Sequence, residues 1–439
     1  MKQSKHNIYY SPKEVRTILE RSIDTALDGL KGYCNDPVSD FTRCRKLPAR
    51  TLIECIMSFS NYSSIGEMSH FFEGHGKMPS ASALSQRRQL LDPDIFKRIN
   101  NLFVSAFDDH TTINGYHILA QDGSDVNIPF MDDKTKTEKH DAKSFCQYHV
   151  NALYDCLNKV FYDWSIDAAS KKREVNALIS ILKNRNYPQN SIFTADRGYE
   201  SYNLMAHFIE NDIKFVIRVK DIHTKSGLMT NIKTEEGAFD MRVNRTLTSL
   251  QTKEIKADKE KYIFVPTTSN FDFLDETRDF YDLSFRAVRF KISEDTYETV
   301  VTNLSEEEFK ADDFKELYHY RWNEETAFNK LKYTIGLVYF HARKRKLIQQ
   351  EINAAFLMYN VSEVIIRNIS VKKNKKLEYD YKINFSSAVT NIRLYLRKKI
   401  KMKELILRIK KFLVAQRPER SYERNIKGQS CKPLNYRTS

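Results

Sequence analysis

The chain has 439 residues, of which 41% are hydrophobic and 12% aromatic, a composition typical of a folded protein rather than a disordered one. Its length suggests about two to four structural units. No apolar run approaches the roughly 18 residues that a membrane-spanning helix needs, and the N-terminal segment lacks the apolar core of a signal peptide. We therefore expect a cytoplasmic protein without a membrane partner. The cysteines are scattered without a CxxC pair, which argues against disulfides and a zinc site.

Positive charge is concentrated at one end of the chain. The formal net charge is +14, and residues 371–439 contain 20 Lys and Arg residues against 5 Asp and Glu residues, a net charge of +15. The other 370 residues therefore carry a net charge of about −1. A basic excess confined to one segment indicates a polyanionic partner, most often nucleic acid; the alternative is a solubilising tail.

Residues 1–112 are predicted to form a helical DNA-binding region. The helix expected at residues 80–91 follows a loop with Gly and Pro and carries Arg87 and Arg88. Arg87 and Arg88 are candidates for DNA contact in a helix-turn-helix unit, although short helices after turns are common in proteins without that role. The other helices are expected at residues 11–30, 48–61, 65–74 and 92–107.

Residues 113–221 change to a pattern of strands. An apolar strand at 116–129 is expected to end in acidic residues, and two more strands, joined near Leu157, follow at 145–167. After them the pattern predicts helix 172–185, strand 191–199, helix 201–212 and strand 214–221. Three strands followed by helix, strand, helix and strand is the order of an RNase-H-like fold, a mixed sheet with flanking helices.

Three further regions complete the predicted organisation. Charged turns and short apolar runs at residues 222–305 indicate a β-rich insertion. Residues 306–369 return to helices and form the second part of the core, including the helix that carries Glu325. Residues 370–439 are predicted to be a basic helical C-terminal region.

One helix is predicted to carry four functional side chains. The string YHYRWNEETAFNKLK has no Gly or Pro, so we expect it to be one helix. At about 100° per residue, four of its residues fall within roughly 60° of one face. These residues are Tyr318, Arg321, Glu325 and Lys332. A carboxylate flanked by phosphate-binding side chains suits a metal-dependent enzyme that acts on a nucleic-acid backbone, whereas the alternative is a salt-bridged surface helix.

Two more acids are expected to join this helix. Asp122 and Asp196 each end an apolar strand beside a glycine, where side chains line a cleft rather than the core, although each could instead cap a turn. With Glu325 they supply hard oxygen ligands for two Mg²⁺ ions about 4 Å apart. Asp125 would lie on the opposite strand face from Asp122. Glu324 is rotated about 100° from Glu325, which favours Glu325 as the third acid.

At these motifs the chain resembles the DDE transposases of bacterial insertion sequences, specifically insertion sequence family four. The resemblance covers roughly residues 40–365, including the β-rich insertion. Its Y-R-E-K spacing is highly specific, whereas its DG[ST] and DRG[YF] strand ends alone are weak signals. The matching residues are Asp122, Gly123 and Ser124; Asp196, Arg197, Gly198 and Tyr199; and Tyr318, Arg321, Glu325 and Lys332.

The resemblance implies cut-and-paste DNA transposition. Asp122, Asp196 and Glu325 would be the catalytic residues, with Mg²⁺ or Mn²⁺ as cofactor. Two chains would pair the terminal inverted repeats in a synaptic dimer, cleave the strands and join the 3′-hydroxyls to target DNA. The side chains that would grip DNA phosphates are Tyr318, Arg321 and Lys332. A bacterial, nucleoid-associated location follows from the same resemblance.

The sequence departs from the resemblance in one respect and leaves two alternatives. Some relatives carry a tryptophan in the insertion that stacks on a flipped base, but this chain has only Trp164 and Trp322, both outside it. The hairpin step therefore stays open. One alternative is a transposase-derived DNA-binding protein without catalysis, against which the intact acid triad argues. The other is a junction or repair nuclease of the same fold, which would not need the Y-R-E-K register.

Overall fold

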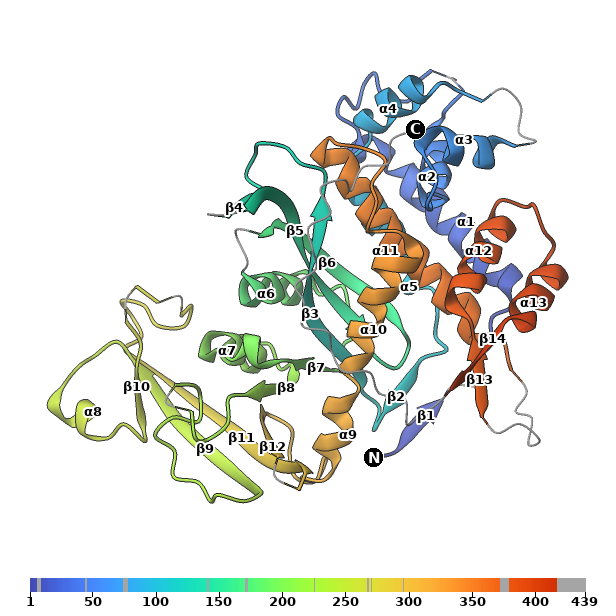
Figure 1. Ribbon diagram of the computed structural model, residues 1–439. Coiled ribbons are helices and arrows are strands. Elements are labelled where there is room, and N and C mark those ends of the chain that lie inside the picture. Colours follow the sequence, from blue (N-terminus) through green and yellow to red (C-terminus); the bar gives the residue numbers. More distant parts are fainter. Residues whose placement is uncertain are drawn as a thin grey trace.

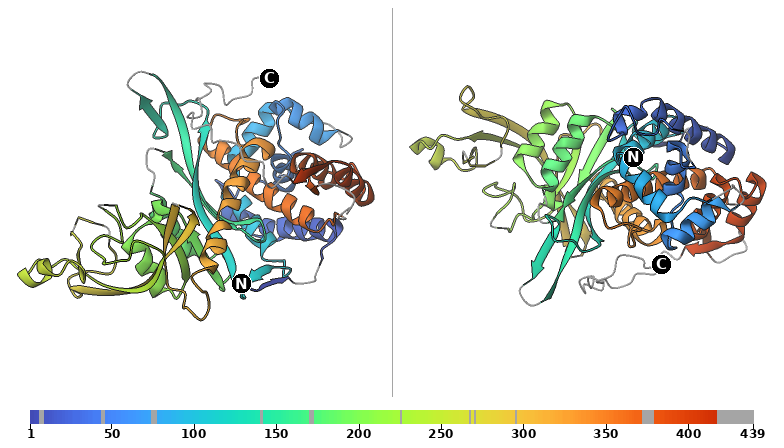
Figure 2. Two further views of the ribbon diagram at one scale, coloured as in Figure 1. Left: turned by 60° about the horizontal axis from the view of Figure 1, so that its bottom comes forward. Right: turned by 90° about the horizontal axis from the view of Figure 1, so that it is seen from above.

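The protein has a mixed α/β architecture in which helices cover both faces of a large sheet (Figure 1). The N-terminal and C-terminal helices gather on one face, and helices α6 and α7 lie on the other (Figure 2). The prediction of a mixed sheet with flanking helices is confirmed. The computed structural model describes residues 1–5, 9–43, 46–73, 78–139, 142–169, 173–224, 226–266, 268–269, 271–294, 296–371 and 379–416.

The first part of the chain is helical, as its sequence predicts. Serines start several of these helices, because their hydroxyls accept an otherwise unpaired backbone N–H of the first turn: Ser11 caps α1, Ser63 caps α3 and Ser80 caps α4. The elements are β1 (Gln3–Lys5), α1 (Pro12–Asp28), the 3-10 helix η1 (Leu30–Tyr33), α2 (Ala49–Met57), α3 (Ser64–Phe72), α4 (Ala81–Leu90) and α5 (Asp94–Val104).

The central sheet is built from strands that alternate with helices along the chain. Strand β3 lies between β7, to which it is parallel, and β5, to which it is antiparallel. Strand β8 extends the sheet beyond β7. The elements of this part are β2 (Thr111–Ile113), β3 (His117–Ile128), β4 (Lys136–Lys139), β5 (Ala142–Asp155), β6 (Val160–Ala168), α6 (Glu174–Asn184), β7 (Ser191–Ala195), the 3-10 helix η3 (Arg197–Tyr199), α7 (Tyr202–Glu210) and β8 (Lys214–Val219).

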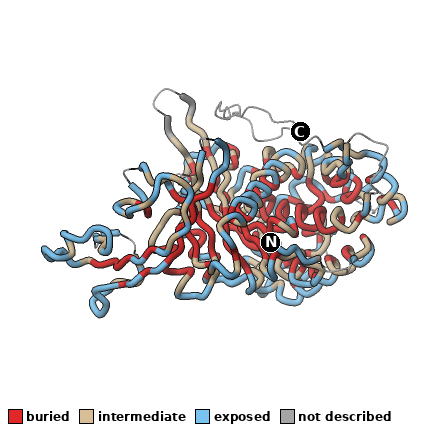
Figure 3. The backbone as a smooth tube through the Cα atoms, turned by 90° about the horizontal axis from the view of Figure 1, so that it is seen from below, coloured by how far each residue is buried: buried red, intermediate tan, exposed pale blue. Residues whose placement is uncertain are grey.

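The segment predicted as a β-rich insertion continues the central sheet. Strand β12 pairs antiparallel with β8, and β11, β9 and β10 follow it outward. Its far end reaches away from the rest of the molecule and is largely exposed (Figure 3). The elements are β9 (Phe239–Thr248), α8 (Lys253–Ala257), β10 (Tyr262–Phe264), β11 (Phe280–Ser293) and β12 (Thr296–Thr302).

The stretch expected to be one helix is divided into three. Helix α9 (Asp313–His319) gives way to α10 (Trp322–Lys330) and then to a π-helical turn, η4 (Leu331–Ile335). At the first junction, Arg321 N–H bonds to the carbonyl of Tyr318 and Glu324 N–H to that of Arg321, so the backbone tightens to three-residue spacing. The prediction of one regular helix was therefore wrong, although all four signature residues remain in helical turns.

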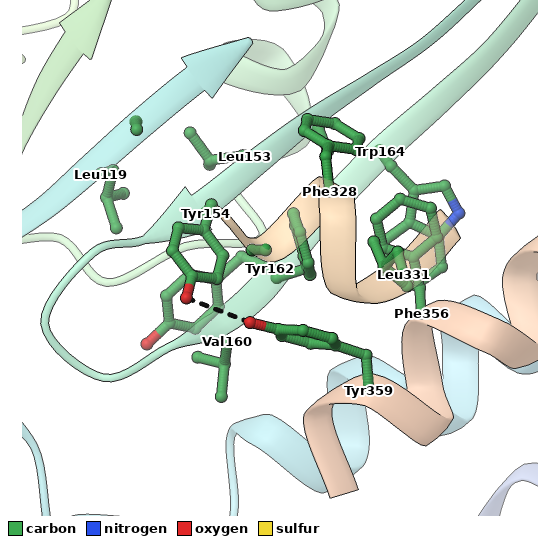
Figure 4. Close-up of a cluster of buried hydrophobic side chains, with 14 of the residues drawn as sticks. Leu119, Leu153, Tyr154, Val160, Tyr162, Trp164, Phe328, Leu331, Phe356 and Tyr359 are labelled. Carbon is green, nitrogen blue, oxygen red and sulfur yellow. Dashed lines mark hydrogen bonds between the residues drawn. The ribbon is translucent and has the colours of Figure 1, made fainter. Parts of the chain in front are cut away.

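Helix α11 (Arg345–Arg367) is buried almost along its whole length, because it lies between the sheet and the N-terminal helices. Its side chains meet those of β5, β6 and α10 in an aromatic cluster (Figure 4). Phe356 stacks on Trp164 with ring centroids 4.4 Å apart, and the hydroxyls of Tyr154 and Tyr359 lie 3.2 Å apart. This packing fixes α10 against the sheet and thereby positions the functional residues at its start.

The C-terminal part adds a two-stranded antiparallel sheet and two helices beside α1. In the part of the chain that the structure describes, no helix is both long and apolar enough to cross a lipid bilayer. Residues 417–439 of the predicted basic region lie outside the described residues. The elements are β13 (Asp380–Ile383), α12 (Phe385–Leu396), α13 (Met402–Lys411) and β14 (Leu413–Gln416).

Candidate active site

Two of the three predicted acids lie side by side on neighbouring strands. In the parallel pair of β3 and β7, Gln121 is in register with Ala195, so the next residues, Asp122 and Asp196, stand at the same level. Strand β7 ends there, whereas β3 continues six residues further along β5. The prediction that Asp122 ends its strand was therefore wrong, but the two carboxylates still share one edge of the β3–β7 pair.

Helix α10 brings the third acid to this edge through an arginine. Arg321, at the start of α10, places Nη1 3.6 Å from Oδ2 of Asp122 and Nη2 3.5 Å from Oε1 of Glu325. Its side chain is only 5% exposed. A single buried guanidinium therefore links the strand acid to the helix acid.

The electrostatics of Asp122 show that the three carboxylates influence one another. Burial raises the pKa of Asp122 to about 6, and the negative charges of Asp196 and Glu325 add to the rise. The backbone N–H of Gly123, 2.8 Å from Oδ1, and the Arg321 guanidinium act in the opposite direction. The Arg321 guanidinium thus offsets only part of the combined effect of burial and of the neighbouring acids.

Glu324 is also part of this region, although sequence reasoning set it aside. It is 0% exposed, and neither carboxyl oxygen has a hydrogen-bond partner among the described residues. Burial raises its pKa well above the ordinary value, and the charges of Asp122 and Glu325 raise it further. Glu324 is therefore fully buried, whereas Glu325 is half-buried and paired with Arg321. Helical rotation alone could not reveal this difference in burial.

The other two signature residues lie closer to the protein interior than expected. Tyr318 is 2% exposed, and its hydroxyl has no hydrogen-bond partner within the described residues. Lys332 is half-buried; burial lowers its pKa, while the charges of Asp125 and Asp122 act against that effect. Both side chains lie near the acidic region, but a phosphate could reach the Tyr318 hydroxyl only after a local rearrangement.

A second cluster of charged side chains lies behind strand β3. Asp125 is in register with His149 of β5, and its Oδ1 lies 2.7 Å from Nδ1 of that histidine. The other ring nitrogen, Nε2, lies 3.0 Å from Oε1 of Glu174, at the start of α6. Burial lowers the pKa of His149, but the two carboxylates outweigh burial and raise it to about 9. His149 is therefore a buried cation at pH 7.

The two candidate DNA-contacting arginines of α4 are engaged within the protein. Arg88 is 3% exposed, and its Nη2 lies 2.7 Å from Glu351 of α11. This burial argues against DNA contact by Arg88. Arg87 is half-buried, donates from Nε to the Leu47 carbonyl and stacks over the ring of Phe41. The predicted helix itself is present as α4, capped by Ser80.

The donor set of the site suits a hard divalent cation. Asp122, Asp196 and Glu325 offer carboxylate oxygens, the preferred ligands of Mg²⁺, and a cation among them would act against the burial and the negative neighbours that raise the pKa of Asp122. In the described residues, no three Asp, Glu, His or Cys side chains stand close enough together to form a ready metal site. The carboxylates therefore fit the metal by chemistry, and binding requires them to converge.

Comparison with known proteins places the chain in a family. No curated protein shows a significant match. Among solved structures, the chain is similar to a piggyBac transposase synaptic complex with hairpin DNA determined by cryo-EM, at a TM-score of 0.44 and 12% identity over 96% of this chain and 90% of that chain. The sequence model described as the transposase DDE domain matches residues 113–361, more than half of the chain and the part that bears all three acids. The chain therefore belongs to the transposase DDE domain family.

Proposed function

We propose that the protein is a cut-and-paste transposase of insertion sequence family four and that Asp122, Asp196 and Glu325 are its catalytic residues. The observation that carries the proposal is that these acids, which come from three distant segments, lie in one region of the molecule. Asp122 stands at the level of Asp196 on the neighbouring strand, and Arg321 ties Asp122 to Glu325. A salt-bridged surface helix would not bring its glutamate to two strand acids.

The catalytic core of this proposal is RNase-H-like and consists of residues 113–221 and 306–369, with the β-rich segment 222–305 between them. Asp122, Asp196 and Glu325 would hold two Mg²⁺ or Mn²⁺ ions. When bound, such ions activate the attacking water or 3′-hydroxyl and stabilise the leaving oxygen of a phosphoryl transfer.

The basic and phenolic side chains of the signature bind and orient DNA in this proposal. Arg321 already lies between two of the acids, so a phosphate that enters the site meets its guanidinium there. Its Nε and the Tyr318 hydroxyl have no hydrogen-bond partners within the described residues, so both can donate to phosphate oxygens after rearrangement. Lys332 supplies a further cation near Asp122.

The proposed transposase acts on two kinds of DNA, the terminal inverted repeats of its element and the target DNA. Two chains would hold two ends in a homodimeric synaptic complex. The C-terminal helix α13 and the residue before it support a DNA partner, because they expose basic side chains that a phosphate backbone can reach. These side chains are Lys401, Lys403, Lys410 and Lys411.

Cleavage of end DNA tests the proposal. Short inverted repeats that flank the coding region supply the substrate, and the same DNA with scrambled repeats supplies the control. With Mg²⁺ or Mn²⁺, we expect the wild-type protein to cut only the substrate with intact repeats. The variant D122A/D196A/E325A should bind that substrate without cutting it, since carboxylates hold metal and do not read bases. Cleavage by this triple variant would refute the assignment.

A further inference from the structure

The charged cluster behind β3 connects the two strand acids of the proposed active site. His149 lies directly under the backbone next to Asp122: a Cβ atom added to Gly123 would stand 2.3 Å from Nε2 of His149. Only glycine leaves room for the imidazole at this position. The histidine therefore touches the β3 backbone one residue after the first catalytic acid.

Glu174 reaches the turn that carries the second acid. Gly198 donates its backbone N–H to Oδ1 of Asp196, at 2.7 Å, and so fixes the direction of that carboxylate. A Cβ atom added to Gly198 would lie 3.4 Å from Oε2 of Glu174. Glu174 thus lies 3.0 Å from His149 through Oε1, and its Oε2 lies beside the position that a side chain at residue 198 would take.

We propose that His149 and Glu174 are positioning residues that hold Asp122 and Asp196 at the separation that metal binding and DNA cleavage require. This inference rests on the proposed function and adds two residues to it. Asp125 completes the arrangement, because it fixes the other ring nitrogen of His149. The pair acts from behind the strand, on the face opposite Asp122, and touches neither the metal nor the DNA.

The cost of the arrangement supports a role beyond stability. Burying a histidine between two carboxylates takes charges out of water, and such pairs are weak contributors to folding compared with apolar residues of similar size. The His149 side chain is 2% exposed, whereas Glu174 and Asp125 are partly exposed at 32% and 34%. The interaction instead fixes the positions of β5 and α6 relative to the backbone beside both acids.

The test compares two variants of the pair with a matched control in the full-length protein. His149→Gln and Glu174→Gln remove the ion pair at either end. His207→Gln removes a second histidine–carboxylate pair outside the proposed site, in which buried His207 of helix α7 lies 2.7 Å from exposed Asp272. Three quantities are measured: single-turnover cleavage of end DNA, end-DNA affinity, and Mn²⁺ affinity of the protein–DNA complex by electron paramagnetic resonance.

We expect H149Q and E174Q to slow cleavage and weaken Mn²⁺ binding by roughly 10- to 100-fold, with end-DNA affinity nearly unchanged. The double variant should be no worse than the more impaired single variant, because the two residues act as one unit. H207Q should match the wild type in all three measurements.

Unchanged cleavage and Mn²⁺ affinity in both variants would overturn the inference. A loss in E174Q alone would also overturn it, because it would show that Glu174 acts directly rather than through His149. If the wild type and H207Q both fail to cleave end DNA, the proposed function fails instead. In that case the Mn²⁺ affinities of H149Q and E174Q, compared with those of the wild type and H207Q, still test whether the pair positions the two acids.

Discussion

Two buried charge clusters of this protein differ in how their charges are balanced. The helical charge network consists of Arg88, Glu351, His341 and Glu67, and it joins α4, α3 and α11. Glu351 lies 2.7 Å from Arg88 and 3.1 Å from His341. Burial would raise the pKa of Glu351, but these two cations lower it below the ordinary value. Every charge of the network has a partner of opposite sign.

The proposed active site has an excess of acid instead. Arg321 is the cation between Asp122 and Glu325, Glu324 is buried without a hydrogen-bond partner among the described residues, and the pKa of Asp122 is raised to about 6. The helical charge network is balanced pair by pair, whereas the proposed active site holds more acid than Arg321 can neutralise. A site that awaits cations keeps its carboxylates close together at a cost to the fold.

The largest expected effect is on catalysis. Asp122→Asn and Asp196→Asn should each reduce end cleavage by about 10³-fold or more, because each removes a carboxylate that would hold metal. The melting temperature should stay the same or rise, since one of several mutually repelling acids becomes neutral. Single-turnover cleavage and thermal melting measure the two effects. A marked fall in melting temperature would show that these acids stabilise the fold as those of the helical charge network do, which would contradict the account.

The opposite result is expected in the helical charge network. Glu351→Gln should lower the free energy of unfolding by about 3 kcal/mol or more, because it leaves Arg88 buried without its partner. Glu404→Gln is the control: it breaks the exposed pair with Arg408, 2.6 Å apart, and should change stability by less than about 1 kcal/mol. Urea denaturation compares both with the wild type. Equal effects of the two variants would contradict the account.

The same network predicts a dependence of stability on pH. Burial lowers the pKa of His341, but Glu351 and Glu67 outweigh burial and raise it from 6.5 to about 9. Because the folded-state pKa is the higher one, the stabilisation is complete below pH 6.5 and is lost as the pH rises through about 9. The loss should reach up to about 3 kcal/mol. Urea denaturation of wild type and His341→Gln at several pH values tests this, and a constant difference between them would refute it.

The smallest effect concerns the basic C-terminal region, where several lysines of α13 are exposed. Replacing Lys403, Lys410 and Lys411 of α13 by Gln should make the log–log salt dependence of DNA binding shallower by about 0.9 for each phosphate that these side chains no longer neutralise. Any preference for the ends should persist. Binding titrations at several salt concentrations measure the slope. An unchanged slope with loss of the dimer would show that α13 is a subunit interface.

Much of the fold follows from local pattern. The N-terminal helices begin at serine caps, and strands β5 and β6 lie where alternation of apolar residues predicts them. The glycines beside Asp122 and Asp196 stand at close approaches of other side chains to the backbone, which sets both acids apart from ordinary core packing. Local signals sufficed because each of these features depends on neighbours in the sequence.

The predictions that were wrong concern residues whose partners lie far away in the sequence. The polar run after Asp122 looks like a strand end, yet pairing with β5 keeps it extended. Nothing in the sequence marks the tightened turn at Arg321, which lacks Gly and Pro. Arg88 is expected to be a surface charge until Glu351, far along the chain, is placed beside it. His149 and Glu174 likewise meet only once β5 and α6 are assembled.

The most direct test of the central claim uses two adjacent glutamates of α10. Glu325→Gln removes the carboxylate that pairs with Arg321 in the proposed site, whereas Glu324→Gln replaces a fully buried carboxyl group, whose pKa burial raises, by an amide of nearly the same shape. The measurement is single-turnover cleavage of end DNA with Mg²⁺ by the two variants side by side. The account predicts that E325Q loses cleavage by about 10³-fold and that E324Q stays within about tenfold of the wild type. Cleavage that survives in E325Q and is lost in E324Q would contradict it.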